Sequence, residues 1–76
     1  MLRYIDLRGT PCPVNFIRCR LELEGLDHNQ KLKVDLDRGE PEDMVVSGLT
    51  KEGHKIEQIL VKNNWIRLII TRNEIR

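Results

Sequence analysis

The sequence predicts an α/β fold of the α+β kind: a two-layer sandwich with two helices on one face of a four-stranded mixed sheet. Three observations lead to this prediction. Residues 31–37 alternate cleanly between apolar and polar, a helical pattern stands on each side of them, and residues 55–71 have the pattern of a hairpin. With short connections, the order βαβαββ leaves one face of the sheet without helices. The length fits one domain over residues 1–76.

The first third of the chain predicts a strand followed by a helix. Residues 2–7 predict the strand, with Ile5 and Leu7 facing inward. Residues 13–24 predict the helix, which ends at Gly25 and carries two apolar stripes. One stripe consists of Val14, Ile17 and Leu21, and the other consists of Phe16, Cys19 and Leu23.

The middle of the chain predicts a second strand and a second helix. Residues 31–37 form the clearest strand pattern in the sequence. The helix is expected to start at Pro41, whose fixed φ suits the first helical position, and Gly53 is expected to close it. Gly48 lies inside this helix and is expected to weaken it. The inward-facing residues of both segments are Leu32, Val34, Leu36, Val45 and Leu49.

The last third predicts a hairpin around Asn63-Asn64, a pair that tolerates the positive φ of a type I′ turn. Such a turn places Val61 opposite Ile66. The face toward the helices then contains Ile59, Val61, Ile66, Leu68 and Ile70, and the helix-free face contains Leu60, Trp65 and Ile69. The second group predicts an exposed apolar interface, unless the stems of Lys62 and Arg67 cover it.

Composition excludes several classes of protein. Thirteen Lys and Arg balance twelve Asp and Glu without a block of like charges, which argues against a nucleic-acid-binding module. The longest apolar runs are three residues, far short of a membrane span. The first residues lack the apolar region of a signal peptide, so we expect a cytoplasmic protein.

No metal or other cofactor is expected. The sequence contains no CxxC, and His28 and His54 stand at no recognisable ligand spacing. Acidic residues between positions 35 and 43 match no calcium loop and are interpreted as a charged helix start. Cys12 and Cys19 would lie about 10 Å apart on one helix, too far for a disulfide.

Cys12 stands between Pro11 and Pro13, directly before the first helix. Because Pro13 suits the first helical position, Cys12 is predicted to be the N-cap. The unpaired N–H groups and the dipole at that end of a helix favour thiolate over thiol, so we expect an exposed nucleophile with a lowered pKa. Cys19, in contrast, is interpreted as a small buried hydrophobic residue.

The stretch DLRGTPCP at residues 6–13, followed by an amphipathic helix in a chain of this length, resembles the SirA/TusA family of sulfur-carrier proteins. The resemblance covers essentially the whole chain. It implies that Cys12 accepts persulfide sulfur from a cysteine desulfurase and passes it to an acceptor protein, as in tRNA thiolation, without direct contact to nucleic acid or membrane. Pro13 would be the first proline of the family motif, and Arg8-Gly9 the approach that precedes it.

The sequence departs from the family motif at one position. The hallmark Cys-Pro-x-Pro reads Cys-Pro-Val-Asn here, with Asn15 in place of the second proline. Asparagine restores a backbone N–H and adds an amide, both of which are expected within reach of the Cys12 sulfur. The second proline also shapes the surface that partner enzymes recognise, so the partners of this chain stay open.

Three functions from different classes remain. The first is a sulfur carrier or sulfurtransferase, in which partner enzymes supply the general base and oxyanion hole that this chain lacks. The second is a binding or regulatory module in which Cys12 only caps the helix. The third is a thiol redox protein, which is disfavoured because a redox pair needs a second cysteine within reach of Cys12.

Overall fold

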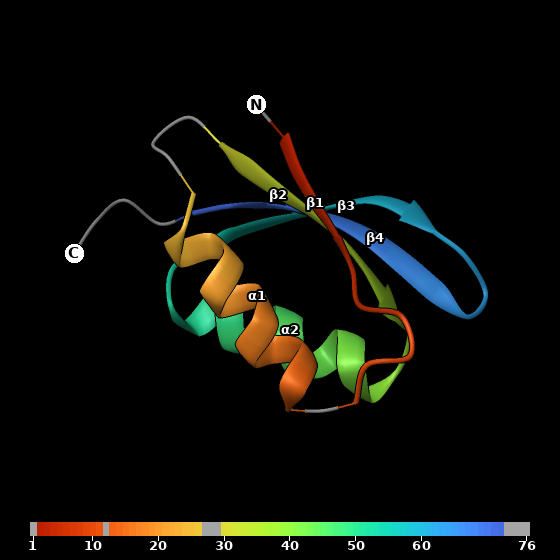
Figure 1. Cartoon of the computed structure of the whole chain (residues 1–76). Helices are drawn as coiled ribbons and strands as arrows, with labels where there is room; N and C mark the ends of the chain where they lie inside the picture. Colours follow the sequence, from red (N-terminus) through yellow and green to blue (C-terminus); the bar gives the residue numbers. More distant parts are fainter. Residues whose placement is uncertain (1, 12, 27–29, 73–76) are drawn as a thin grey trace.

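The computed structural model describes residues 2–11, 13–26 and 30–72. Its elements are β1 (Leu2–Asp6), α1 (Val14–Glu24), β2 (Lys31–Asp37), α2 (Glu40–Lys51), β3 (Lys55–Val61) and β4 (Trp65–Thr71). The sheet has the order β1-β2-β4-β3, with β1 parallel to β2 and the other two pairings antiparallel. Both helices lie on one face of the sheet (Figure 1). The predicted fold class is confirmed.

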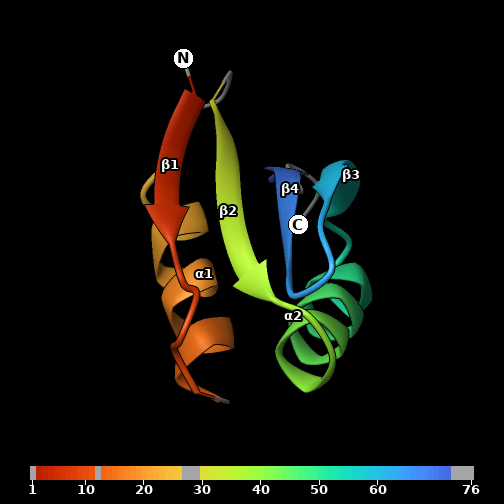
Figure 2. The same cartoon turned by 90° about the vertical axis from the view of Figure 1, so that its right-hand side faces the viewer.

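Strand β2 lies in the middle of the sheet and supplies the centre of the core. The predicted inward residues of β2 and α2 are all fully buried, and Leu7 is buried directly after β1. The two helices divide the sheet between them: α1 packs below β1 and β2, and α2 packs toward β3 and β4 (Figure 2). No helix among residues 2–11, 13–26 and 30–72 is long and apolar enough to cross a membrane.

The two apolar stripes of α1 have different environments. Cys19 and Leu23, from the second stripe, are buried, and Phe16 packs against the core beside them. The first stripe instead faces away from the core, where its three side chains remain exposed. Gly48 of α2 has a packing role that its interpretation as a weak helix position missed. A Cβ at this position would stand only 2.9 Å from Cζ of the Phe16 ring, so the absent side chain makes room for that ring.

The hairpin pairs as predicted at its turn, with Val61 opposite Ile66. Its turn is not type I′, however, because no non-glycine residue in the described part of the chain has a positive φ. A β-bulge between Gln58 and Leu60 then shifts the register, so that Ile59 is an extra residue on β3. Ile59 and Val61, predicted to face the core, are about half exposed (50% and 49%), and Ile56 packs against the core instead.

Candidate functional site

The two cysteines differ in what the structure describes. Cys12, the predicted nucleophile and N-cap, lies outside the described residues, whereas its neighbours Pro11 and Pro13 lie within them. Cys19 has no exposed surface, and this burial raises the pKa of its thiol to about 12. A thiol with that pKa is almost entirely protonated at neutral pH and is closed to a second protein. The interpretation of Cys19 as a buried hydrophobic residue is confirmed.

Helix α1 begins one residue later than predicted. Its N-cap is Pro13, with φ −93° and ψ 10°, and its first helical residue is Val14. The Pro13 carbonyl accepts a hydrogen bond from the Ile17 N–H at 3.1 Å. The Pro13 side chain has no acceptor for a cap bond, and the N–H groups of Asn15 and Phe16 in the first turn find other acceptors. The prediction that Cys12 is the N-cap is therefore corrected: Cys12 comes one residue before the cap.

Asn15, which replaces the second motif proline, is fully buried in the first turn of α1. Its N–H donates to the Pro11 carbonyl at 3.1 Å, and its side-chain Oδ1 accepts the Phe16 N–H at 2.6 Å. The backbone donor that asparagine restores is thus used to tie Pro11 to the helix. The expectation that this N–H lies within reach of the sulfur concerns Cys12, which is outside the described residues, so it stays a prediction.

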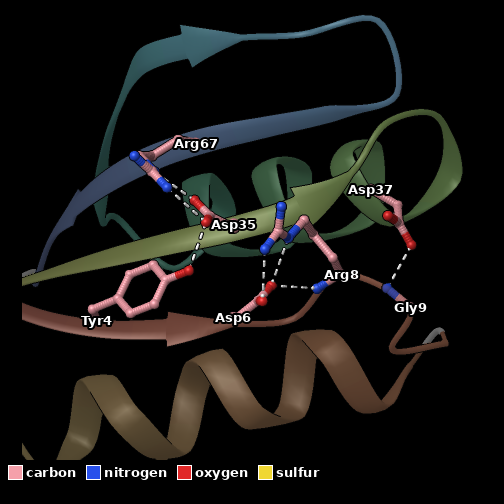
Figure 3. A network of polar contacts seen from close by, with 7 residues as sticks. All are labelled: Tyr4, Asp6, Arg8, Gly9, Asp35, Asp37 and Arg67. Atoms are coloured by element: carbon pink, nitrogen blue, oxygen red, sulfur yellow. Dashed lines mark hydrogen bonds and ion pairs between the residues drawn. The ribbon is translucent and has the colours of Figure 1, made fainter.

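The loop that leads to Pro11 is held at the ends of two strands. Leu7 is buried and accepts the Thr10 N–H at 3.0 Å, which closes a turn through Gly9. Gly9 has φ +81°, a conformation that suits glycine because it has no Cβ. Its N–H donates to Asp37 Oδ2 at 2.7 Å (Figure 3). The carboxylate at the end of β2 therefore fixes the loop three residues before Cys12.

Arg8 points across the open face of the sheet and is held by Asp6. The guanidinium donates to both carboxylate oxygens of Asp6 at 2.9 Å, and the Arg8 N–H donates to Oδ1 at 3.1 Å (Figure 3). These bonds lower the pKa of Asp6 to about 2. The guanidinium carbon also lies 4.8 Å from the centroid of the Trp65 ring. Arg8 thus links the end of β1 to β4.

A second polar group lies beside it, centred on the buried carboxylate of Asp35. Arg67 donates two hydrogen bonds to this carboxylate at 2.7 and 2.9 Å, and the Tyr4 hydroxyl donates a third at 2.6 Å. The Arg67 guanidinium, followed by the Tyr4 hydroxyl, lowers the pKa of Asp35 against the opposing effect of burial. The same contact raises the pKa of Tyr4. We call the residues of these two groups the open-face network; they are Tyr4, Asp6, Arg8, Asp35, Trp65 and Arg67.

The apolar cluster predicted on this face is partly covered. Leu60, Trp65 and Ile69 are each of intermediate exposure. The guanidinium carbons of Arg8 and Arg67 lie 4.8 and 5.2 Å from the Trp65 centroid. The contact between Arg67 and Trp65 agrees with the alternative to an exposed interface, in which Arg67 covers part of the cluster.

Sequence reasoning missed the roles of Asp35 and Asp37. It assigned them to a charged helix start, whereas both are strand residues with partners on other strands or loops. Their place in the alternation, opposite the inward residues of β2, was the available signal, but the partners of Asp35 are 31 and 32 residues away in sequence. Within the described ranges, no three His, Cys, Asp or Glu side chains come together as metal ligands.

Comparison with known proteins relates the chain to one family. The family model described as Sulfurtransferase TusA matches residues 3–72. Among solved structures, a SirA-like protein from Desulfitobacterium hafniense superposes with a TM-score of 0.78 and 24% sequence identity, over 97% of this chain and 100% of that chain. No curated protein matches the sequence. The superposition agrees with the predicted fold, and the family match agrees with the resemblance found in residues 6–13.

Proposed function

The chain belongs to the TusA family of sulfurtransferases, and we propose that it carries sulfur as a persulfide on Cys12. The observation that supports this assignment most is the burial of the other cysteine. The sequence contains two cysteines, and Cys19 is enclosed in the core with a pKa of about 12. A carrier must expose its sulfur to two partner proteins in turn, so Cys12 is the residue that remains.

Sulfur is received in a single exchange step. The Cys12 thiolate attacks the outer sulfur of a donor persulfide, donor-S-SH. The new bond joins the Cys12 sulfur to that atom, the donor's S–S bond breaks, and the donor cysteine leaves as a thiolate. The products are Cys12-S-SH and donor-S⁻, so atoms, charge and electrons balance. A cysteine desulfurase is the proposed donor, and an acceptor protein, such as one of tRNA thiolation, then takes the outer sulfur by the same exchange.

The chain's own contribution is to hold Cys12 in place and to favour its thiolate. Pro11 is tied to α1 through Asn15, and Gly9 is tied to β2 through Asp37, so the residues on the approach to Cys12 are fixed before a partner arrives. The cap of α1, Pro13, follows Cys12 in sequence, and the positive end of a helix favours a thiolate. We therefore expect the rate of Cys12 alkylation to rise with a midpoint below about pH 8.5, the ordinary value for cysteine.

Intact mass tests the proposal. After incubation with a cysteine desulfurase and cysteine, wild type should gain about 32 Da, the mass of one sulfur atom, and a reductant should remove it. Cys12→Ser should gain nothing, because a hydroxyl forms no persulfide. Cys19→Ser is the matched control: it should melt at a lower temperature, because it puts a hydroxyl into the core, and yet gain the same mass. Gain of mass by Cys12→Ser and not by a folded Cys19→Ser would contradict the assignment.

A further inference from the structure

The outer face of α1 carries a stripe of exposed apolar side chains. Val14, Ile17 and Leu21 are 45%, 48% and 62% exposed. Cys19 and Leu23, on the inner face of the same helix, have almost no exposed surface. A helix that packs on a sheet normally turns polar residues to the solvent, so a second apolar stripe contributes nothing to this core. We call the three residues the outer stripe.

The spacing of the outer stripe is that of a helix that enters a groove of another protein. Its members stand at positions i, i+3 and i+7, which follow one line along the helix surface. Helices recognised in apolar grooves present anchors at these spacings. Contiguous apolar surface on a small protein also marks sites of protein contact.

The position of the stripe relates it to sulfur transfer. It begins two residues after Cys12 and extends over eight residues, from Val14 to Leu21, or about 10 Å along the axis. Cys12 directly precedes the Pro13 cap of α1 in sequence, so a protein that brings its own sulfur to Cys12 comes close to the first turn of that helix, where Val14 stands. The surface of that protein therefore meets the stripe in the same encounter.

A charge beside the stripe indicates what the partner presents. Arg18 is exposed and is a helical neighbour of both Val14 (i+4) and Leu21 (i+3). It forms no ion pair or hydrogen bond with another residue in the described part of the chain. By contrast, Arg20 is paired with Glu52, the residue that directly follows α2. A carboxylate on the partner would complement the Arg18 guanidinium.

We propose that the outer stripe is the docking surface for the protein that donates sulfur to Cys12, and that this donor offers an apolar groove with a carboxylate on its rim. The inference rests on the proposed function, because it takes Cys12 as the carrier. It adds a recognition surface separate from the reacting sulfur.

Ile17→Ser tests the inference against a closely matched control, Ile59→Ser. The two isoleucines are 48% and 50% exposed, but Ile59 belongs to β3 and not to the helix that follows Cys12. Each variant is loaded from a cysteine desulfurase with cysteine and, separately, from glutathione persulfide, which needs no docking surface. Ile17→Ser should lose roughly tenfold or more in kcat/KM with the desulfurase and load normally from glutathione persulfide. Ile59→Ser should match wild type with both donors.

Arg18→Glu provides a second variant on the same surface. Loading from the desulfurase should slow, and the defect should shrink as salt is raised, because screening weakens the contact between exposed charges. Leu21→Ser, at the most exposed position, replaces Ile17→Ser should the latter lose its native circular dichroism spectrum.

Each other outcome overturns the inference. Wild-type loading of Ile17→Ser from the desulfurase would leave Cys12 a carrier with a different docking surface. Normal loading with slow transfer to the acceptor would assign the stripe to the wrong partner, and equal slowing with both donors would place the effect on the thiol. Wild type that loads from glutathione persulfide but from no desulfurase would have another donor. Wild type that loads from neither would also refute the proposed function.

Discussion

The two faces of the sheet are stabilised by different chemistry, and adjacent residues of β2 illustrate this. Val34 faces the helices and Asp35 faces the helix-free side, yet neither has exposed surface. Val34 is enclosed by apolar side chains of the core, whereas Asp35 is enclosed by Arg67 and Tyr4, which hydrogen-bond to it. One strand thus buries a hydrocarbon on one side and a carboxylate on the other.

The two faces of the sheet contribute differently to folding. Apolar burial on the covered face supplies most of the favourable free energy of folding, but the hydrophobic effect is not directional. A buried ion pair adds little net stability compared with apolar residues, but loss of one member leaves the other without its partner. The Asp35 carboxylate is bonded to residues on both neighbouring strands, β1 and β4, so it fixes their register across the middle of the sheet.

The largest effect is expected on the covered face. Leu36→Ala removes a fully buried side chain of β2 and should lower the free energy of unfolding by about 3 kcal/mol, because it leaves a cavity in the core. Urea denaturation measures the change. Leu21→Ala, at an exposed position of α1, should change it by less than about 0.5 kcal/mol. Equal losses in the two variants would contradict the placement of Leu36 inside the core and of Leu21 outside it.

A smaller loss is expected on the open face. Asp35→Asn keeps the shape of the side chain but removes the charge that Arg67 binds, and should cost about 2 kcal/mol. The Arg67 side chain is 29% exposed, so water can partly replace the lost contact. Tyr4→Phe in each background measures the coupling between the hydroxyl and the carboxylate. Additive effects of the two substitutions would show that the network does not act as a unit.

The contribution of the open face to the free energy of unfolding should also depend on pH. The pKa of Asp35 is lowered in the fold, so its contribution is present above the pKa of the unfolded chain, about 4, and is lost as the pH falls through the lower folded value. The difference in free energy of unfolding between wild type and Asp35→Asn should therefore narrow between about pH 5 and pH 2. Asp6, with a pKa of about 2, contributes the same slope to both proteins. A constant difference would contradict the assignment.

The smallest effect on stability is expected from Arg8→Ala. Its contacts with Asp6 and Trp65 are at the surface, where water screens them, so their loss should change the free energy of unfolding very little. Trp65 fluorescence should respond more clearly, with stronger quenching by acrylamide once the guanidinium is gone. Arg20→Ala, in the helical layer, serves as the control. Unchanged quenching in Arg8→Ala would show that Arg8 does not cover the ring in solution.

Much of the fold followed from local pattern. Three local signals predicted element boundaries to within one residue. They are the alternation in residues 31–37, the acidic start of α2 and the Gly25 that ends α1. Periodicity could not decide which stripe of α1 faces the core, because both have helical spacing. That choice depends on how Phe16 fits against Gly48 of another helix.

Less of the candidate site than of the fold could be predicted from the sequence. The cysteine and its flanking prolines could be found from sequence, because they are adjacent. The start of α1 moved by one residue because the Pro13 carbonyl accepts the first helical hydrogen bond. The bond from Gly9 to Asp37 spans 28 residues and appears only when the end of β2 meets the loop after β1. Local sequence patterns cannot predict a contact between residues so far apart along the chain.

The bulge in β3 has a consequence for how this chain behaves at high concentration. β3 is an edge strand that shows the aliphatic side chains of Ile59 and Val61 to solvent, a combination that invites strands of other molecules to pair with it. The extra residue interrupts the regular spacing of N–H and C=O groups along that edge. Deleting Ile59 would restore a regular edge strand that can pair with strands of other molecules. The resulting protein should aggregate at concentrations at which the natural chain stays in solution.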